Sequence, residues 1–162
     1  MKKLLLISAL ACALNLHADN LGTVEYSLQP TFSNWNIFEE TKTGPLNTII
    51  YTPKGVPQTE TPELFVVIST NQPRGSTNPE QIRQEIQNSF PGMEVQVDML
   101  KQDNDVTLYT WSVSKGDKAL SGITKGFNTN PGTVIMTYQT LNKLTDETKA
   151  NWLKVISDAH VK

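Results

Sequence analysis

The chain of 162 residues has very few of the side chains that carry out nucleophilic or metal-dependent catalysis. Cysteine occurs once, at Cys12, and histidine twice, at His17 and His160. Zinc sites are built from several Cys, His or carboxylate ligands, and a Ser–His pair would have to use His160 close to the end of the chain, where residues fray. We therefore expect no metal, no other cofactor and no nucleophilic triad.

Glycine-rich phosphate loops are missing as well. The segment Arg74-Gly75-Ser76-Thr77 joins an apolar stretch to a predicted helix, but it lacks the Lys-Ser/Thr pair of a phosphate-binding loop. Pro79 has no amide hydrogen to offer to an anion. We interpret the segment as an ordinary connection, with an anion site at Arg74 as the alternative.

No hydrophobic run is long enough to span a bilayer, which takes about 20 residues. The longest lies at the N-terminus, where Lys2 and Lys3 precede a mostly apolar stretch at 4–16 and small residues lead to Ala18. This three-part layout is typical of an export signal. It predicts cleavage between Ala18 and Asp19, with residues 1–18 as signal peptide and 19–162 as a single mature domain.

A second way of processing stays open. Residues 9–12, Ala-Leu-Ala-Cys, loosely resemble a lipoprotein signal, in which Cys12 would be acylated and become the first residue. An envelope lipoprotein anchored through Cys12 is therefore an alternative to a secreted or periplasmic protein.

Cleavage after Ala18 removes 18 of the 162 residues and leaves 144, a length that fits one domain. Without Lys2 and Lys3, 12 basic residues remain against 16 acidic ones, a net charge of −4. Such a chain has no general attraction to nucleic acid or to anionic lipid. We expect no nucleic-acid partner and no transmembrane segment in the mature chain.

Hydrophobic alternation and turn signals predict a β-rich domain. The predicted strands are 22–28, 34–41, 46–51, 63–69, 93–101, 106–113, 121–128 and 133–141. The stretch 63–69 is apolar without alternation, so we expect a central strand buried on both faces. Asp103-Asn104-Asp105 predicts a hairpin turn rather than a calcium loop, which needs more oxygen ligands.

Two helices are predicted. Asn78 and Pro79 are typical of a helix start, and Ile82, Ile86 and Phe90 recur at a spacing of four residues along one face. A closing helix runs from the N-cap Thr145 to about Ala159. Its predicted apolar stripe consists of Trp152, Leu153, Ile156 and Ala159. Hairpins dominate the order of elements, so we expect an α+β fold: a mainly antiparallel sheet of about six strands covered by two helices.

This order resembles the PsbP-like fold of small exported bacterial proteins. The resemblance is carried by YTPKG at 51–55, ELFVVIS at 63–69, MEVQVDMLKQDNDVTLYTWSV at 93–113 and GTVIMTYQTL at 132–141, followed by a helix with Trp152. It implies an α+β sandwich and a role as an accessory or interaction domain. It implies no enzymatic mechanism and no functional residue.

Two surface features are candidate binding sites. Phe32, Trp35 and Phe38 would form an adhesive patch for a protein, a glycan or a lipid if they are exposed, or would pack into the first hairpin. The second feature is a glycine-rich region with three lysines that could bind an anion: Lys115, Lys118 and Lys125.

Glu39 and Glu40 are neighbours on a predicted strand and should point to opposite faces, so they do not form a catalytic pair by themselves. The hypothesis that follows is an exported, non-catalytic binding or interaction protein, carried by a type II route toward a host if it leaves the cell. A carboxylate-based hydrolase is the alternative, and it requires clustered carboxyl groups with raised pKa values.

Overall fold

The computed structural model describes residues 24–28, 31–57, 60–73, 75, 77–129 and 132–161. They form nine strands and two helices. In chain order these are β1 (Val24–Glu25), β2 (Trp35–Thr43), β3 (Leu46–Pro53), β4 (Glu63–Thr70), α2 (Pro79–Ser89), β5 (Glu94–Gln102), β6 (Val106–Lys115), β7 (Lys118–Asn128), β8 (Thr133–Thr140), α3 (Asp146–Asp158) and β9 (His160–Val161).

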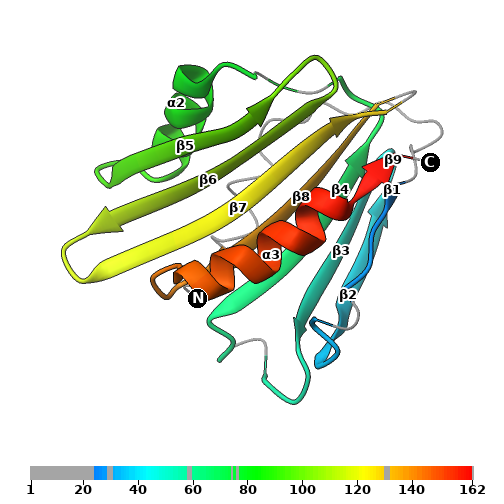
Figure 1. Cartoon of the computed structure of the whole chain (residues 1–162), viewed down its shortest axis with the longest axis horizontal. Coiled ribbons are helices and arrows are strands. Elements are labelled where there is room, and N and C mark those ends of the chain that lie inside the picture. The colour runs from blue at the N-terminus through cyan, green and yellow to red at the C-terminus, as the bar shows by residue number, and fades with distance from the viewer. Residues whose placement is uncertain are drawn as a thin grey trace.

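The main sheet is antiparallel and has seven strands in the order β2-β3-β4-β8-β7-β6-β5 (Figure 1). Two meanders build it: β2–β3–β4, and β5–β6–β7–β8. They join where β4 pairs with β8 along its whole length, from Glu63 opposite Thr140 to Thr70 opposite Thr133. This seam places ELFVVIS in the middle of the sheet, where its side chains are buried or half-buried on both faces as predicted.

The α+β class and the antiparallel sheet are confirmed, whereas the count of about six strands was too low by one. The predicted strand at 22–28 is corrected: of its described residues, 24–28, Val24–Glu25 form a strand, and it pairs with β9 instead of joining the main sheet. β9 was not predicted, because two residues are too short to show a periodicity.

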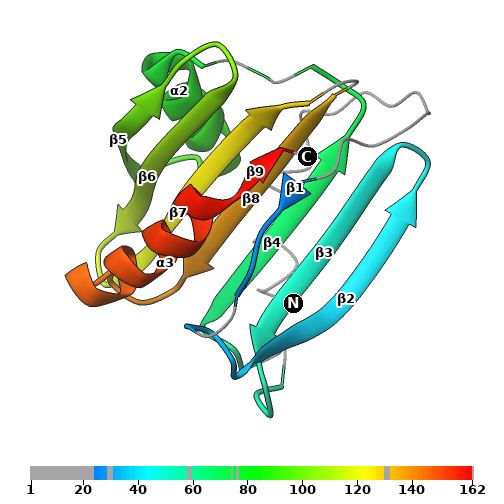
Figure 2. The ribbon, with the colours of Figure 1, turned by 45° about the vertical axis from the view of Figure 1, so that its right-hand side comes forward.

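The two helices lie on opposite faces of the sheet (Figures 1 and 2). Asn78 caps α2 as predicted, since its side chain accepts hydrogen bonds from the amides of Glu80 and Gln81. Ile86 and Phe90 of this helical segment pack against the β5–β6 end of the sheet. Thr145 caps α3, accepting from the amide of Thr148, and the buried face of that helix includes Val155 in addition to the predicted stripe.

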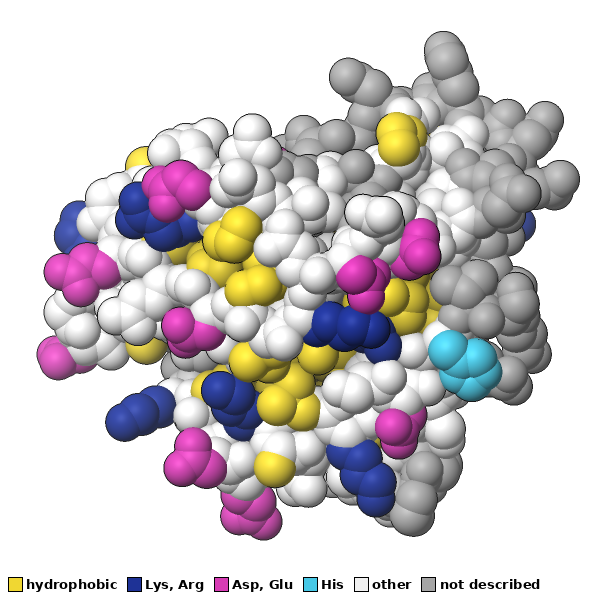
Figure 3. Space-filling model, turned by 45° about the horizontal axis from the view of Figure 1, so that its top comes forward, with side chains coloured by type: hydrophobic (Ala, Val, Ile, Leu, Met, Phe, Trp, Pro, Cys, Tyr) yellow, Lys and Arg dark blue, Asp and Glu magenta, His cyan; other side chains and the backbone are white. Residues whose placement is uncertain are grey.

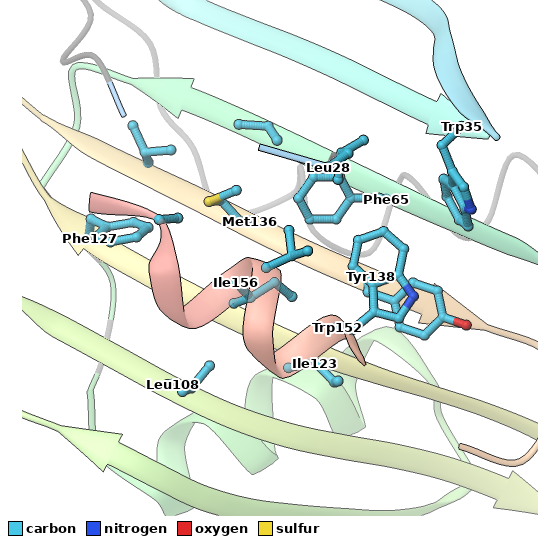
Figure 4. Packing of buried hydrophobic residues seen from close by; sticks show 14 residues of the cluster. Leu28, Trp35, Phe65, Leu108, Ile123, Phe127, Met136, Tyr138, Trp152 and Ile156 are labelled. Atoms are coloured by element: carbon cyan, nitrogen blue, oxygen red, sulfur yellow. The ribbon is translucent and has the colours of Figure 1, made fainter. Parts of the chain in front are cut away.

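The α3 face holds the main hydrophobic core, and its centre is aromatic (Figure 4). Trp152 of α3 stacks between Phe32, at 4.0 Å between ring centroids, and Tyr138 of β8, at 4.4 Å. Trp35 and Phe65 pack around it at 5.0 and 4.9 Å. One tryptophan thus holds together the helix, the central strands and the segment that precedes β2.

Both edges of the main sheet are interrupted by a bulge. On β2 the register shifts between Ile37 and Glu39, and on β5 it shifts between Met99 and Lys101. The bulged residues are Phe38 and Leu100, and both are exposed. A bulge distorts the row of free backbone groups and so opposes pairing of the edge with another sheet.

A buried lysine fastens the C-terminal end of α3. Lys125 of β7 is 6% exposed, and its Nζ donates hydrogen bonds of 2.8 Å to the carbonyls of Ser157 and Ala159. The same Nζ lies 4.5 Å from the centre of the Phe127 ring. Burial lowers the pKa of Lys125 and nearby Lys101 acts in the same direction. The last carbonyl groups of a helix have no partner within the helix and carry a partial negative charge, so a cation there is stabilising. Lys125 therefore serves as a cap of α3.

Replacing this cap should cost stability. Lys125→Met keeps the alkyl stem but leaves two carbonyls unpaired, and we expect the free energy of unfolding to fall by about 2–3 kcal/mol. Lys101→Met is the matched control, because the exposed pair of Lys101 with Asp103 is worth less than about 1 kcal/mol. Urea denaturation of both variants measures the difference. Equal losses would show that Lys125 is not a cap.

Candidate binding face

The face of the sheet on which α2 lies, here the α2 face, combines apolar and small polar side chains. Alternation along each strand decides which residues point to it, and the cross-strand pairing aligns them. Six threonines on this face are buried although they are polar: Thr52, Thr70, Thr107, Thr124, Thr133 and Thr137. An ordinary solvent-facing sheet would leave such positions exposed.

The threonines at the centre of the α2 face form hydrogen bonds with one another. Trp111 Nε1 donates to Thr124 Oγ1 at 3.0 Å, and Thr124 Oγ1 shares a hydrogen bond of 2.7 Å with Thr137 Oγ1. Thr137 Oγ1 also donates to the carbonyl of Ile123 at 3.3 Å. The network connects β6, β7 and β8 and fixes the indole of Trp111 against the sheet.

Gly122 makes room for this indole. It lies opposite Trp111 in the pairing of β6 with β7, and a Cβ at position 122 would lie 2.5 Å from Trp111 Cε2. No real Cβ approaches a carbon atom so closely, so any other residue would push the ring away. The glycine therefore lets an aromatic ring lie flat across β7.

Gln139 is the exceptional polar residue on this face. It is 4% exposed, and its Oε1 has no hydrogen-bond partner within the described part of the chain. It lies on β8 between Leu64 of β4 and Gly122 of β7. A buried acceptor without a partner costs roughly 1–3 kcal/mol, so its presence indicates a donor that the described residues do not supply.

An apolar cluster, the β3–β4 cluster, borders Gln139. It consists of Ile50, Leu64, Val66 and Ile68, all buried, with Leu46 as their half-buried neighbour. α2 packs against β5 at the other end of the face, and the described helices and strands leave the β3–β4 side without a covering layer (Figure 2). One face of a sheet cannot bury its own side chains, so this cluster requires a cover beyond the described elements.

At the α2 end the face is bounded by two groups with raised pKa values. Burial raises the pKa of Tyr109 to about 12; a hydrogen bond with Thr124 opposes the rise and the charge of Glu85 adds to it. Burial also raises the pKa of the Glu85 carboxyl on α2. A carboxylate-based hydrolase would need several such groups close together, and that alternative stays a prediction.

The three aromatic candidates lie in different environments in the structure. Trp35 is 7% exposed and belongs to the core, and Phe32 is half-buried against Trp152. Of the two alternatives, exposure or packing, both residues therefore follow packing, with partners on α3 and the central strands. Phe38 is 43% exposed, but it stands at the β2 bulge without the other two.

The three lysine candidates also lie in different environments. Lys115 and Lys118 lie opposite each other across the β6–β7 hairpin and are exposed, whereas Lys125 is buried under the end of α3. The proposed basic loop is corrected accordingly, because its third member already serves as a helix cap. On the side of the molecule seen in Figure 3, acidic and basic side chains are interspersed, with no field of one sign.

The remaining candidates behave as ordinary structural residues. Glu39 and Glu40 pair with Ile50 and Ile49 and so point to opposite faces, as predicted. Asp103 caps the predicted hairpin turn, where its carboxylate accepts hydrogen bonds from the amides of Asp105 and Val106.

His160 is exposed in β9, and no group of three or more metal-ligating side chains occurs within the ranges given above. Arg74, Cys12, His17 and the cleavage site at Ala18 and Asp19 lie outside the described residues.

The chain is similar in structure to a solved protein. No protein-family model and no curated protein matches the sequence. The crystal structure of LpqN, a Mycobacterium tuberculosis protein involved in cell envelope biogenesis, aligns with a TM-score of 0.47 and 14% sequence identity, over 90% of this chain and 87% of that one. Of the helices described here, none is long and apolar enough to cross a membrane.

Gly122→Ala tests the arrangement of Trp111. The added Cβ displaces the indole from Thr124, and we expect a loss of about 1–3 kcal/mol in the free energy of unfolding together with a changed near-UV tryptophan signal. Gly75→Ala is the control, since a Cβ at position 75 meets nothing within 4 Å. An unchanged tryptophan spectrum in Gly122→Ala would contradict the packing described here.

Alkaline titration tests the buried phenols. Burial raises the pKa of Tyr26, Tyr109 and Tyr138, and hydrogen bonding with Tyr51 and with Glu63 adds to the rise for Tyr26 and Tyr138 respectively. These groups stabilise the fold fully below pH 10, their ordinary value, and the contribution is lost as the pH rises through the folded values. At pH 11 we expect the tyrosinate absorbance at 295 nm to increase when denaturant is added. No increase would show that the phenols ionise in the folded state.

Proposed function

We propose that this protein is an exported, non-catalytic binding protein and that the α2 face is its recognition surface. The observation that carries the proposal is the combination on one face of an apolar cluster that no described helix or strand covers and a buried amide oxygen to which no described residue donates. Large apolar surfaces rimmed by polar groups are typical of binding sites. The PsbP-like fold and the export signal remain part of this proposal.

The chain processed at Ala18 cannot supply the cover from its own N-terminus. Only residues 19–23 would precede β1, and five residues span at most about 17 Å. β1 packs on the α3 side of the sheet, since Val24, Tyr26 and Leu28 contact the main core there. These residues would have to pass around the sheet edge before they reached the β3–β4 cluster. We infer that the cluster is open to a partner in the processed protein.

Thiol labelling tests whether the face is open. Val66 and Val67 are equally buried neighbours on β4, at 4% exposed each, but Val66 points to the α2 face and Val67 into the main core. The sequence has no cysteine after Cys12, so a new thiol is the only one in the processed chain. In the protein purified after export, we expect a maleimide to label Val66→Cys rapidly and Val67→Cys only upon unfolding. Equal protection of both thiols would overturn the proposal.

A further inference from the structure

The shape of the β3–β4 cluster indicates the chemistry of its ligand. Leu64, Val66 and Ile68 follow one another on the same face of β4 at intervals of about 6.6 Å, and Ile50 of β3 lies beside Val66. The result is an apolar strip about 13 Å long along β4, flanked by Ile50 on β3 and by Ile135 on β8, which is aligned with Ile68. A flexible hydrocarbon chain laid along β4 would contact all three side chains in turn.

The neighbouring strand gives this strip two different ends. Gln139 is aligned with Leu64 at one end, and Thr133 is aligned with Thr70 beyond the other. Thr137, aligned with Val66 in between, already has its hydrogen bonds to Thr124 and Ile123. Of these, Gln139 Oε1 is the acceptor that needs a donor. The acceptor that lacks a hydrogen-bond donor therefore lies at the Leu64 end of the strip.

We propose that the α2 face binds a single-chain amphiphile, with its hydrocarbon chain along Leu64, Val66 and Ile68 and a hydrogen-bond-donating head group at Gln139 Oε1. This inference rests on the proposed function and names the ligand class for the same surface. A hydroxylated or amide head group supplies the missing donor, whereas a head group with acceptors alone leaves Gln139 unpaired. The chain contributes affinity through buried methylene groups, and the head group contributes specificity.

Two dodecyl probes separate these contributions. n-Dodecyl β-maltoside carries hydroxyl donors, and dodecyldimethylamine oxide above pH 8 carries an acceptor and no donor. Both are titrated below their micelle concentrations into the protein purified after export, whose intact mass is measured first. We expect calorimetry to show that both probes bind and that the maltoside binds about tenfold more tightly. One additional buried hydrogen bond raises an affinity by about that factor.

The variants form a matched set. Val66→Thr introduces a hydroxyl into the strip without changing its shape, and we expect it to weaken both probes about tenfold. Val67→Thr makes the same change on the core side and should leave both affinities within twofold. Gln139→Leu removes the acceptor and should abolish the preference for the maltoside while the amine oxide still binds. A preference that survives in Gln139→Leu would overturn the role of Gln139.

The outcomes also separate this inference from the proposed function. If Val66→Cys is labelled by maleimide but neither probe binds, the face is open and the amphiphile is the wrong ligand class. If light scattering shows a dimer that Val66→Thr converts to a monomer, the occupant is a second copy of the chain and the amphiphile proposal is overturned. If Val66→Cys is as protected as Val67→Cys, both proposals fail together.

Discussion

The stacking of Trp152 is the interaction on which the rest of the structure depends. A helix laid on an antiparallel sheet needs side chains that fill the space between the two layers, and here one indole between Phe32 and Tyr138 lies at the centre of that space. The same contact holds the segment before β2 and the central strand β8. It gathers Phe32, Trp35, Phe65 and Tyr138 on the α3 face, whereas the opposite face combines threonines and aliphatic side chains with Trp111 and Tyr109.

Local signals in the sequence predicted most of the elements. Asn78 and Pro79 indicate a helix start without reference to the rest of the chain, and the Asp103 turn forms from hydrogen bonds between near neighbours. The apolar stretch at 63–69 predicted a central strand because a strand that is buried on both faces has no alternation of apolar and polar residues. Such features succeed because the physical cause lies within a few residues of the signal.

The candidate site could not be predicted in this way. Thr124, Thr137 and Gln139 look like ordinary solvent-facing residues of alternating strands, and their burial appears only when β4, β7 and β8 lie side by side. Lys125 similarly looks like a surface charge in the sequence, and its role depends on the end of α3, which lies close to it in the fold. The burial of these polar residues and the position of Lys125 both depend on contacts between segments that are far apart in the sequence. No local sequence pattern indicates such contacts.

The pairing of β1 with β9 joins the two ends of the described chain outside the main sheet. β1 is the first described strand to be synthesised and β9 the last, and each has the other as its pairing partner. A chain that stops before His160 therefore lacks the partner of β1 at its opposite end. Loss of either short strand thus leaves the backbone groups of the other without their cross-strand partner.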